Sequence, residues 1–255
     1  MDAVVDGTLA AARTAARVDL AAALRVAVWY GYHEAIDNHF TLTVPGRPDR
    51  FYLNPYGRHW AELRARDFLE VDHAGAVRAG SGIADQTAIC IHGPIHRLVP
   101  GANCVLHTHM PFATALTQLE DMTVEMIGQT ALGFAGDIAY DYEYGGLAYD
   151  LSEGERLAAL MGGKPIVMMA NHGVLVTGPT VADAFARLYF LERACQTQIY
   201  ALWTGKKRRA IPDAIVAKTR QQYNGWSLPD GVTANELHFA ALKRLLDRRE
   251  PDYVD

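Results

Sequence analysis

Two histidines separated by one residue, His107 and His109, have the residue type and spacing best suited to chemistry in this chain. They follow an apolar stretch, Cys104–Leu106, that predicts a buried strand. Residues i and i+2 of an extended chain project to the same side, so two imidazoles there can chelate one divalent ion. A third histidine, His172, lies in a turn between two predicted buried strands, where Gly173 leaves room beside it. Three histidines with an open position are typical of catalytic metal sites.

The same histidines also have a simpler interpretation. A single His-x-His pair, or one histidine in a turn, often serves only packing and hydrogen bonding. Another pair, His92 and His96, lies four residues apart on one face of a predicted helix and raises the question of a second metal. Spacing and placement therefore leave metal binding and a structural role open as alternatives.

The elements that would position these residues alternate between helices and strands. Periodicity and helix-start residues predict helices at 14–32, 62–68, 87–98, 111–119, 153–161, 179–202 and 235–247. Alternation and apolar runs predict strands at 39–44, 50–53, 69–72, 104–107, 166–170 and 174–176, and a strand followed by a loop at 138–144. A turn over 45–50 would join the first two strands in a hairpin, and Gly93-Pro94 should kink or crowd its helix. The pattern predicts an α/β fold with a mixed sheet and helices on both faces.

Composition excludes several classes of protein. The chain has 255 residues, is 50% hydrophobic and 21% charged, and carries a net charge of −5, which excludes a disordered chain. A pI near 6.0 offers no electrostatic footprint for nucleic acid. The sequence has no signal-peptide pattern and no long apolar span, and its three cysteines have no CxxC spacing. We therefore expect a cytoplasmic protein with reduced cysteines that binds neither nucleic acid nor a membrane.

Two stretches around the histidines resemble motifs of the class II aldolase and adducin family, typified by fuculose-phosphate aldolase and ribulose-phosphate 4-epimerase. Val99–His109 (VPGANCVLHTH) is similar to its first histidine motif, and Met168–Gly178 (MMANHGVLVTG) to its second. A looser match to an N-terminal motif lies at Asn38–Thr41 and Asn54–Gly57. The resemblance covers about residues 15–205. It implies one domain over the whole chain, a three-layer α/β/α fold with a largely antiparallel sheet, and a helical extension after about residue 206.

The resemblance also implies roles for residues and partners. The two histidines of the first motif and His172 would bind one Zn²⁺, with Mn²⁺ or Fe²⁺ as alternatives. Asn38, Asn54 and Gly57 occupy places like those that hold the anionic part of a small-molecule substrate, since amides and backbone N–H groups can donate to an anion. Family members are cyclic homotetramers with the active site at a subunit boundary. A homotetramer is therefore expected, and the tyrosines of 140–149 are candidates to line that boundary.

Three residues of the family pattern are replaced. Sugar-phosphate aldolases of the family carry an acidic proton shuttle about 19 positions before the first metal histidine, where this chain has Ala88. The preceding serine pair, which helps to hold phosphate, is here Gln86-Thr87. Asp85 is the nearest acidic candidate for catalysis, and its alternative role is a helix N-cap. A histidine is usual in the family at the position of His92, which we expect to act by hydrogen bonding or directly in catalysis, whereas His96 is interpreted as structural.

A three-histidine metal ion is a Lewis acid that can accept charge from a chelating substrate. Such a site serves retro-aldol cleavage, epimerisation and decarboxylation, because each leaves an electron pair to be stabilised. With no acid at Ala88 the aldol proton transfer lacks an agent, whereas loss of CO₂ needs only an electron sink. The IHGPIHR segment is similar to the decarboxylase and adducin-like branches. We expect a metal-dependent carbon–carbon lyase, foremost a decarboxylase of a hydroxylated aromatic or heteroaromatic carboxylate. The alternatives are an aldolase or epimerase on a hydroxy-carbonyl substrate, Fe²⁺-dependent oxygen chemistry, and a non-catalytic adducin-like scaffold.

Overall fold

The structure, a computed structural model, describes residues 2–226 and 228–255. In that part of the chain the strands are β1 (His39–Val44), β2 (Arg47–Leu53), β3 (Leu69–Asp72), β4 (Val77–Ala79), β5 (Cys104–Thr108), β6 (Ile138–Asp141), β7 (Ile166–Met169) and β8 (Gly173–Gly178). They form one sheet in the order β4-β3-β2-β1-β5-β8-β7-β6. Only β6 and β7 pair in parallel among these strands, so the sheet is mixed and largely antiparallel, as expected.

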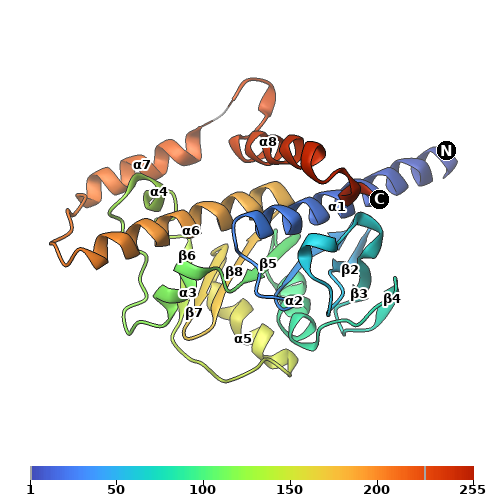
Figure 1. Cartoon of the computed structure of the whole chain (residues 1–255), viewed down its shortest axis with the longest axis horizontal. Helices are drawn as coiled ribbons and strands as arrows, with labels where there is room; N and C mark the ends of the chain where they lie inside the picture. The colour runs from blue at the N-terminus through green and yellow to red at the C-terminus, as the bar shows by residue number, and fades with distance from the viewer. Residues whose placement is uncertain (1, 227) are drawn as a thin grey trace.

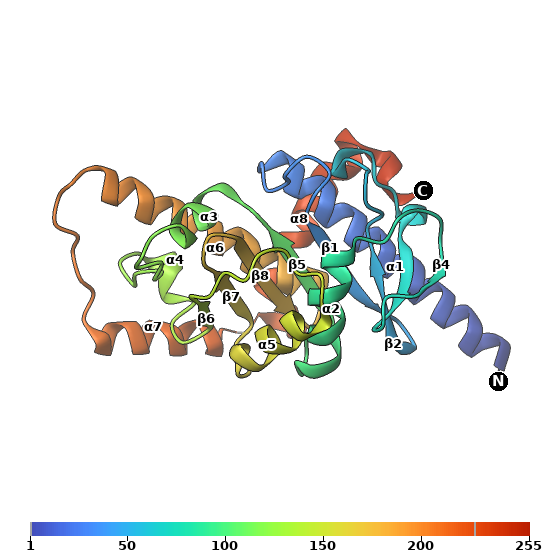
Figure 2. The same cartoon turned by 90° about the horizontal axis from the view of Figure 1, so that it is seen from below.

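Helices cover both faces of the sheet (Figure 1). They are α1 (Asp2–Trp29), α2 (Gln86–Leu98), α3 (Pro111–Thr117), α4 (Gln129–Leu132), α5 (Leu151–Met161), α6 (Val181–Trp203), α7 (Asp213–Gly225) and α8 (Ala234–Arg249) within the described ranges. Seen from below, α2 and α5 lie over one face of the sheet, and α1, α6 and α8 lie behind it (Figure 2). This arrangement confirms the three-layer α/β/α fold. No described helix combines the length and apolar character that crossing a membrane requires.

The register around β5 determines which residues meet. β5 lies between β1 and β8, antiparallel to both. This register pairs His39 with His107 and Thr108 with Val174. The turn that precedes β8 therefore lies at the carboxyl end of β5, next to the two histidines of that strand end.

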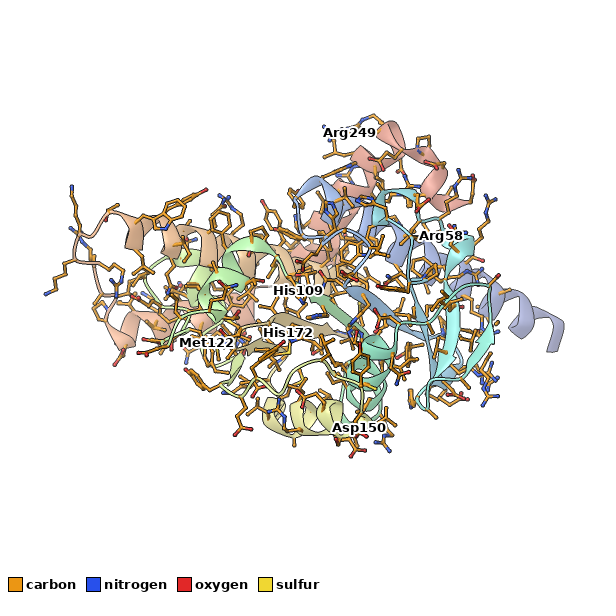
Figure 3. The ribbon with its side chains drawn as sticks, turned by 60° about the horizontal axis from the view of Figure 1, so that its bottom comes forward. Arg58, His109, Met122, Asp150, His172 and Arg249 are labelled. Atoms are coloured by element: carbon orange, nitrogen blue, oxygen red, sulfur yellow. The ribbon has the colours of Figure 1, made fainter. Side chains whose placement is uncertain are left out.

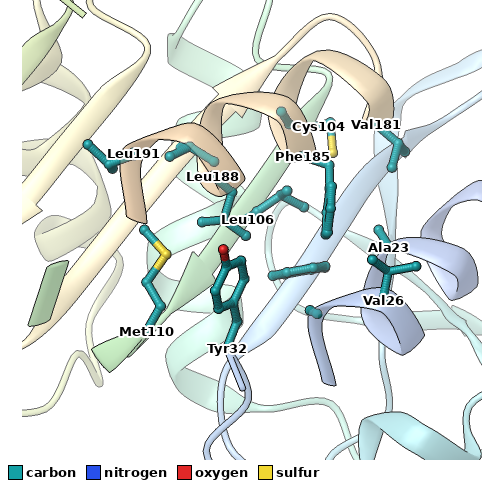
Figure 4. Close-up of a cluster of buried hydrophobic side chains, with 14 of the residues drawn as sticks. Ala23, Val26, Tyr32, Cys104, Leu106, Met110, Val181, Phe185, Leu188 and Leu191 are labelled. Carbon is teal, nitrogen blue, oxygen red and sulfur yellow. The ribbon is translucent and has the colours of Figure 1, made fainter. Parts of the chain in front are cut away.

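The largest core fills the space between the sheet, α1 and α6 (Figure 4). Leu106 of β5 packs there with Phe185 and Leu188 of α6, and all three side chains are fully buried. Burial of each such side chain contributes about 1.5–3 kcal/mol relative to exposure. Alternation along β5 turns Val105 toward a second core, under α2 and α5. His107 has the same parity as Val105 and lies on that second face.

The hairpin turn between β1 and β2 is shorter than the predicted 45–50. β2 begins at Arg47, so only Pro45 and Gly46 form the turn. Gly46 has φ +75°, a left-handed conformation that favours glycine and lets the chain reverse within two residues. The predicted helix at 62–68 is also wrong, since two 3₁₀ turns, Trp60–Glu62 and Ala65–Asp67, occupy this region.

Helix α2 continues through Pro94, and the crowding expected at this point is accommodated by glycines. A Cβ on Gly93 would lie 2.8 Å from the carbonyl oxygen of His73. A Cβ on Gly154 of α5 would lie 2.2 Å from the carbonyl oxygen of Cys90, which Pro94 cannot engage because it lacks an N–H. The two helices can therefore approach closely on the site's side of the sheet.

Helices α4 and α7 and strand β4 were not predicted. Helix α7 buries none of its described side chains, and the three residues of β4 are all exposed.

Helix α8, by contrast, matches the predicted C-terminal helix and packs on α1 and α6. Arg25 of α1 pairs with Glu250 at 3.0 Å and with Asp252 at 3.2 Å, just beyond α8. The division into a core and a C-terminal extension stays a prediction.

Candidate metal centre

Three histidines meet at the carboxyl end of β5; we refer to His107, His109 and His172 as the convergent cluster. One ring nitrogen of each lies within 4.8 Å of the other two. The ring centroid of His172 lies 4.9 Å from the ring centroids of both His107 and His109. His109 and His172 lie next to each other near the centre of the molecule (Figure 3). Three imidazole nitrogens gathered this closely are a donor set that could hold one divalent ion.

His107 is held by a backbone contact. Its side chain is buried, and its Nδ1 donates to the carbonyl oxygen of Val174 at 2.9 Å. Because a carbonyl can only accept, Nδ1 carries the proton and Nε2 has a free lone pair. Burial, and next the neighbouring His172, lower the pKa of His107 well below its usual range. The ring is therefore neutral at pH 7, the state in which imidazole binds a metal.

His109 has one nitrogen without a partner. Its Nδ1 hydrogen-bonds to a carboxylate oxygen of Glu34, and its backbone N–H donates to Oδ1 of Asn38 at 3.2 Å. Its Nε2 is buried and has no hydrogen-bond partner among the described residues. A buried polar atom of this kind calls for an occupant, and a metal ion bound by the convergent cluster would provide one.

His172 reaches the cluster from the turn between β7 and β8. Asn171, with φ +54°, turns the chain and donates its N–H to the carbonyl of Thr117 at 2.8 Å. A Cβ on Gly173 would lie 2.7 Å from Cδ2 of His109, so only glycine allows this approach. Burial, and next the neighbouring His109, lower the pKa of His172 to about 4, and His172 too is neutral at pH 7.

A second set of histidines lies behind the convergent cluster; we call His39, His92 and His96 the histidine chain. Nδ1 of His96 contacts the carbonyl oxygen of Ala102 at 2.9 Å, and its Nε2 contacts the hydroxyl of Thr41 at 2.8 Å. That hydroxyl contacts Nδ1 of His92 at 2.7 Å. Nε2 of His92 in turn contacts Nδ1 of His39 at 2.8 Å. These groups form one buried path from the end of α2 to β1.

The Ala102 carbonyl sets the direction of every bond in this path. Since it can only accept, Nδ1 of His96 carries a proton, and Nε2 accepts from Thr41. The hydroxyl also lies 3.3 Å from the carbonyl oxygen of Val105; with its one proton on the shorter contact to His96, it accepts from Nδ1 of His92, whose Nε2 accepts from His39. This assignment requires neutral rings. Burial, as the largest cause, lowers the pKa of His39 to about 4 and that of His96 to about 3.

Comparison with known proteins places the chain that carries these histidines in one protein family. A family model described as Class II Aldolase and Adducin N-terminal domain matches residues 18–199. The chain belongs to this family. A Caulobacter vibrioides protein whose name places it with the class 2 aldolases is 32% identical over 98% of this chain and 95% of its own length. Human beta-adducin is 30% identical over 73% of this chain, which corresponds to 26% of that protein.

Solved structures of the class II aldolase family share the fold. An aldolase II superfamily protein from Pseudomonas syringae superposes with a TM-score of 0.87 at 33% identity, covering 95% of this chain and 96% of that one. The L-fuculose 1-phosphate aldolase from Glaciozyma antarctica superposes with a TM-score of 0.83 at 23% identity, covering 96% of this chain and 94% of that one. The likeness to the latter shows the fold alone.

At the position of the class II aldolase acid, the structure has a buried alanine. Ala88 is fully buried and belongs to an apolar group with Phe51 and Leu53. Asp85 caps α2, with its Oδ1 2.7 Å from the backbone N–H of Thr87 and 2.7 Å from the Thr87 hydroxyl. These contacts fit the N-cap alternative. A catalytic role for Asp85 stays a prediction.

The expected substrate-binding residues surround β1. Asn54 is buried; its Oδ1 accepts from the N–H of Phe40 at 2.9 Å, and its Nδ2 donates to the carbonyl of Asn38 at 3.4 Å. Asn54 thus holds the start of β1 in place, and Asn38 lies directly beside His109. Gly57 has φ +89°, in a turn after β2. Their contact with a substrate stays a prediction.

Three residues of the site were missed by sequence reasoning. His39 and Thr41 share one face of the predicted first strand, and this i, i+2 pattern was a signal that could have been used. Glu34 lies in the connection between α1 and β1, and nothing in the sequence pairs it with His109. His92 was expected to act by hydrogen bonding or directly in catalysis; both of its ring contacts are hydrogen bonds, and a catalytic role stays a prediction.

Proposed function

We propose that this chain is a metal-dependent carbon–carbon lyase that decarboxylates a hydroxylated aromatic or heteroaromatic carboxylate. The observation that carries the proposal is the convergent cluster, whose ligand atoms lie within 4.8 Å of one another in a family that typically uses a divalent metal. The buried alanine at position 88 supports decarboxylation over aldol cleavage, because the usual proton shuttle is absent from that position.

When bound, a divalent ion, with Zn²⁺ the first expectation, supplies a Lewis acid for the electron pair left after bond cleavage. His107, His109 and His172 would hold the ion through one ring nitrogen each. The bond between the ring carbon and the carboxylate breaks, CO₂ leaves, and the ring carbon takes a proton from water. Asn38 uses its amide oxygen on His109, which leaves its amide nitrogen to donate to the anionic substrate.

The test joins metal analysis to product analysis. The purified protein should contain close to one divalent ion per chain and should release CO₂ from at least one member of a panel of hydroxy-aromatic acids. His172→Ala, purified in the same way, should lose both the ion and the activity. Metal binding without CO₂ release, together with cleavage of a hydroxy-carbonyl compound, would contradict decarboxylation.

A second candidate, aldol cleavage or epimerisation, is favoured by one contact. The Thr87 hydroxyl donates to Asp85, and its oxygen lies 3.3 Å from Nε2 of His39, so a carboxylate lies close to the side of the site. Asp85→Asn separates the candidates, because asparagine is also a good N-cap and retains the helix start. The substitution should leave decarboxylation nearly unchanged, whereas an aldolase that uses this carboxylate should lose about 10²–10⁴-fold in rate.

We also propose that the active form is a homotetramer. The support is the family resemblance together with exposed tyrosines on the loop before α5, among them Tyr142, Tyr144 and Tyr149. The ring of Tyr144 lies 6.5 Å from that of His172, so a partner that covers this loop would also border the site. Light scattering at micromolar concentration tests the assembly, and a monomeric mass would contradict it.

A further inference from the structure

The connection between α1 and β1 has an unusual backbone. Ala35 has φ +50° and Asn38 has φ +70°, both in the left-handed region that side-chain-bearing residues rarely adopt. The connection closes on itself through a hydrogen bond from the N–H of Asp37 to the carbonyl of Glu34 at 2.9 Å. Local strain of this kind persists where the surrounding structure holds it, often next to functional sites.

Two residues of this connection, Glu34 and Asn38, contact the same residue, His109. The Glu34 carboxylate hydrogen-bonds to Nδ1 of its ring, and Oδ1 of Asn38 accepts its backbone N–H at 3.2 Å. Because the carboxylate accepts, Nδ1 donates the proton of this bond, and Nε2 is the nitrogen left available to a metal. Nε2 is the buried nitrogen that lacks a partner in the described part of the chain. The ring and the backbone of one candidate ligand are thus both held by this connection.

We propose that Glu34 is a positioning residue that orients His109 and raises the affinity of the convergent cluster for a divalent metal. This inference rests on the proposed metal site. Its side chain is 57% exposed, so Glu34 contributes little to the core, and a role in packing does not account for its contact. A carboxylate hydrogen-bonded to a metal-binding histidine fixes the tautomer and strengthens the nitrogen as a ligand. His107 receives a neutral carbonyl in the same position, so His109 has the only charged partner of this kind among the described ring contacts of the cluster.

The experiment compares metal affinity across variants of the full chain. Zn²⁺ affinity is measured by competition with a chromophoric chelator, and Co²⁺ absorption reports the coordination geometry. Glu34→Ala should weaken Zn²⁺ binding about 10–100-fold and change the Co²⁺ spectrum. Glu34→Gln keeps an acceptor without the charge and should fall between Glu34→Ala and the original protein.

Two controls separate positioning from general destabilisation. Ala35→Gly accepts the same backbone conformation and removes no group that contacts His109, so its affinity should equal that of the original protein. The thermal midpoint of metal-free Glu34→Ala should also stay unchanged. A midpoint that falls with the affinity would indicate a merely structural role and overturn the proposal.

The outcomes distinguish this inference from the proposed function. If the original protein binds neither Zn²⁺ nor Co²⁺, the metal-dependent lyase fails, and the role of Glu34 fails with it. If the original protein binds both and Glu34→Ala binds them equally well with the same spectrum, only the role assigned to Glu34 is overturned.

Discussion

The convergent cluster and the histidine chain lie on neighbouring elements and consist of the same residue type, yet their contacts differ. In the histidine chain, both ring nitrogens of His92 and of His96 are engaged by protein groups. In the convergent cluster, Nε2 of His109 has no partner in the described residues. Buried polar atoms are nearly always satisfied, so the fully bonded set acts as a scaffold and the incompletely bonded set marks a site. An unpartnered nitrogen alone does not mark a site, since His33, His73 and His238 each have one; His109 differs from them in converging with two other histidines.

Removal of a residue from the convergent cluster should have the largest effect. His107→Ala or His172→Ala deletes a candidate ligand, so metal content and turnover should both fall to background. The expected loss exceeds the roughly 10–100-fold that follows loss of a group hydrogen-bonded to a ligand. Elemental analysis after gel filtration measures the metal. His238→Ala, on α8, is a matched histidine control and should keep full occupancy.

Removal of a residue from the histidine chain should affect stability first. His92→Leu orphans the buried Nδ1–H of His39 and removes one partner of the Thr41 hydroxyl, which keeps its contact with His96. The orphaned N–H should cost about 1–3 kcal/mol of unfolding free energy. Urea unfolding of the metal-free protein measures this cost. Unchanged stability with complete loss of metal would reverse the roles that we assign to the two sets.

Gly173→Ala tests how closely the turn bearing His172 must approach β5. The added Cβ would lie 2.7 Å from both Cδ2 of His109 and the carbonyl oxygen of Thr108. Overpacking of this kind costs about 1–3 kcal/mol, and the displaced rings should bind metal more weakly. Gly145→Ala is the control, because its Cβ would meet no atom within 4 Å. Equal metal affinities in the two variants would show that the cluster tolerates displacement of the turn.

The smallest expected effect is a change in pH dependence. The pKa of His96 is about 3 in the folded protein, below the usual value of 6.5. The unfolded chain therefore binds a proton at His96 below about pH 6.5 that the folded chain does not bind until about pH 3. The contribution of His96 to the unfolding free energy is therefore complete above pH 6.5. Below pH 6.5 it falls by up to about 1.4 kcal/mol per pH unit. Urea unfolding between pH 7 and pH 5 should show a shallower slope for His96→Gln than for the original protein, and parallel slopes would contradict the assignment.

The convergent cluster was predictable from the sequence for a local reason. His107 and His109 share one side of a strand end, and His172 lies in a turn that the flanking apolar strands delimit. The histidine chain was not predictable, because Thr41 meets His92 only through the packing of β1 against α2. No local pattern encodes that packing.

The fold was predictable where elements bury apolar side chains. Strand β5 and helix α6 show the required patterns, since both have buried faces. Helix α7 and strand β4 bury none of their described side chains and so lack the periodicity that prediction uses. The Asp85 contacts illustrate a third limit. From the sequence, Asp85 could be either an acid in the site or the N-cap of α2. Only the structure shows that its carboxylate accepts from the first turn of α2.

The two faces of β5 are open to separate evolutionary pressures. Cys104 and Leu106 face the core beneath α6, where any apolar side chain of similar volume preserves the fold. His107 faces the other layer, where only a side chain with a suitable nitrogen preserves the ligand set. Selection for folding therefore acts on Cys104, Val105 and Leu106, whereas selection for chemistry can act on His107 of the same five-residue strand. A lineage could lose the histidine and keep a stable domain, which is a direct route from an enzyme to a protein used only for its shape.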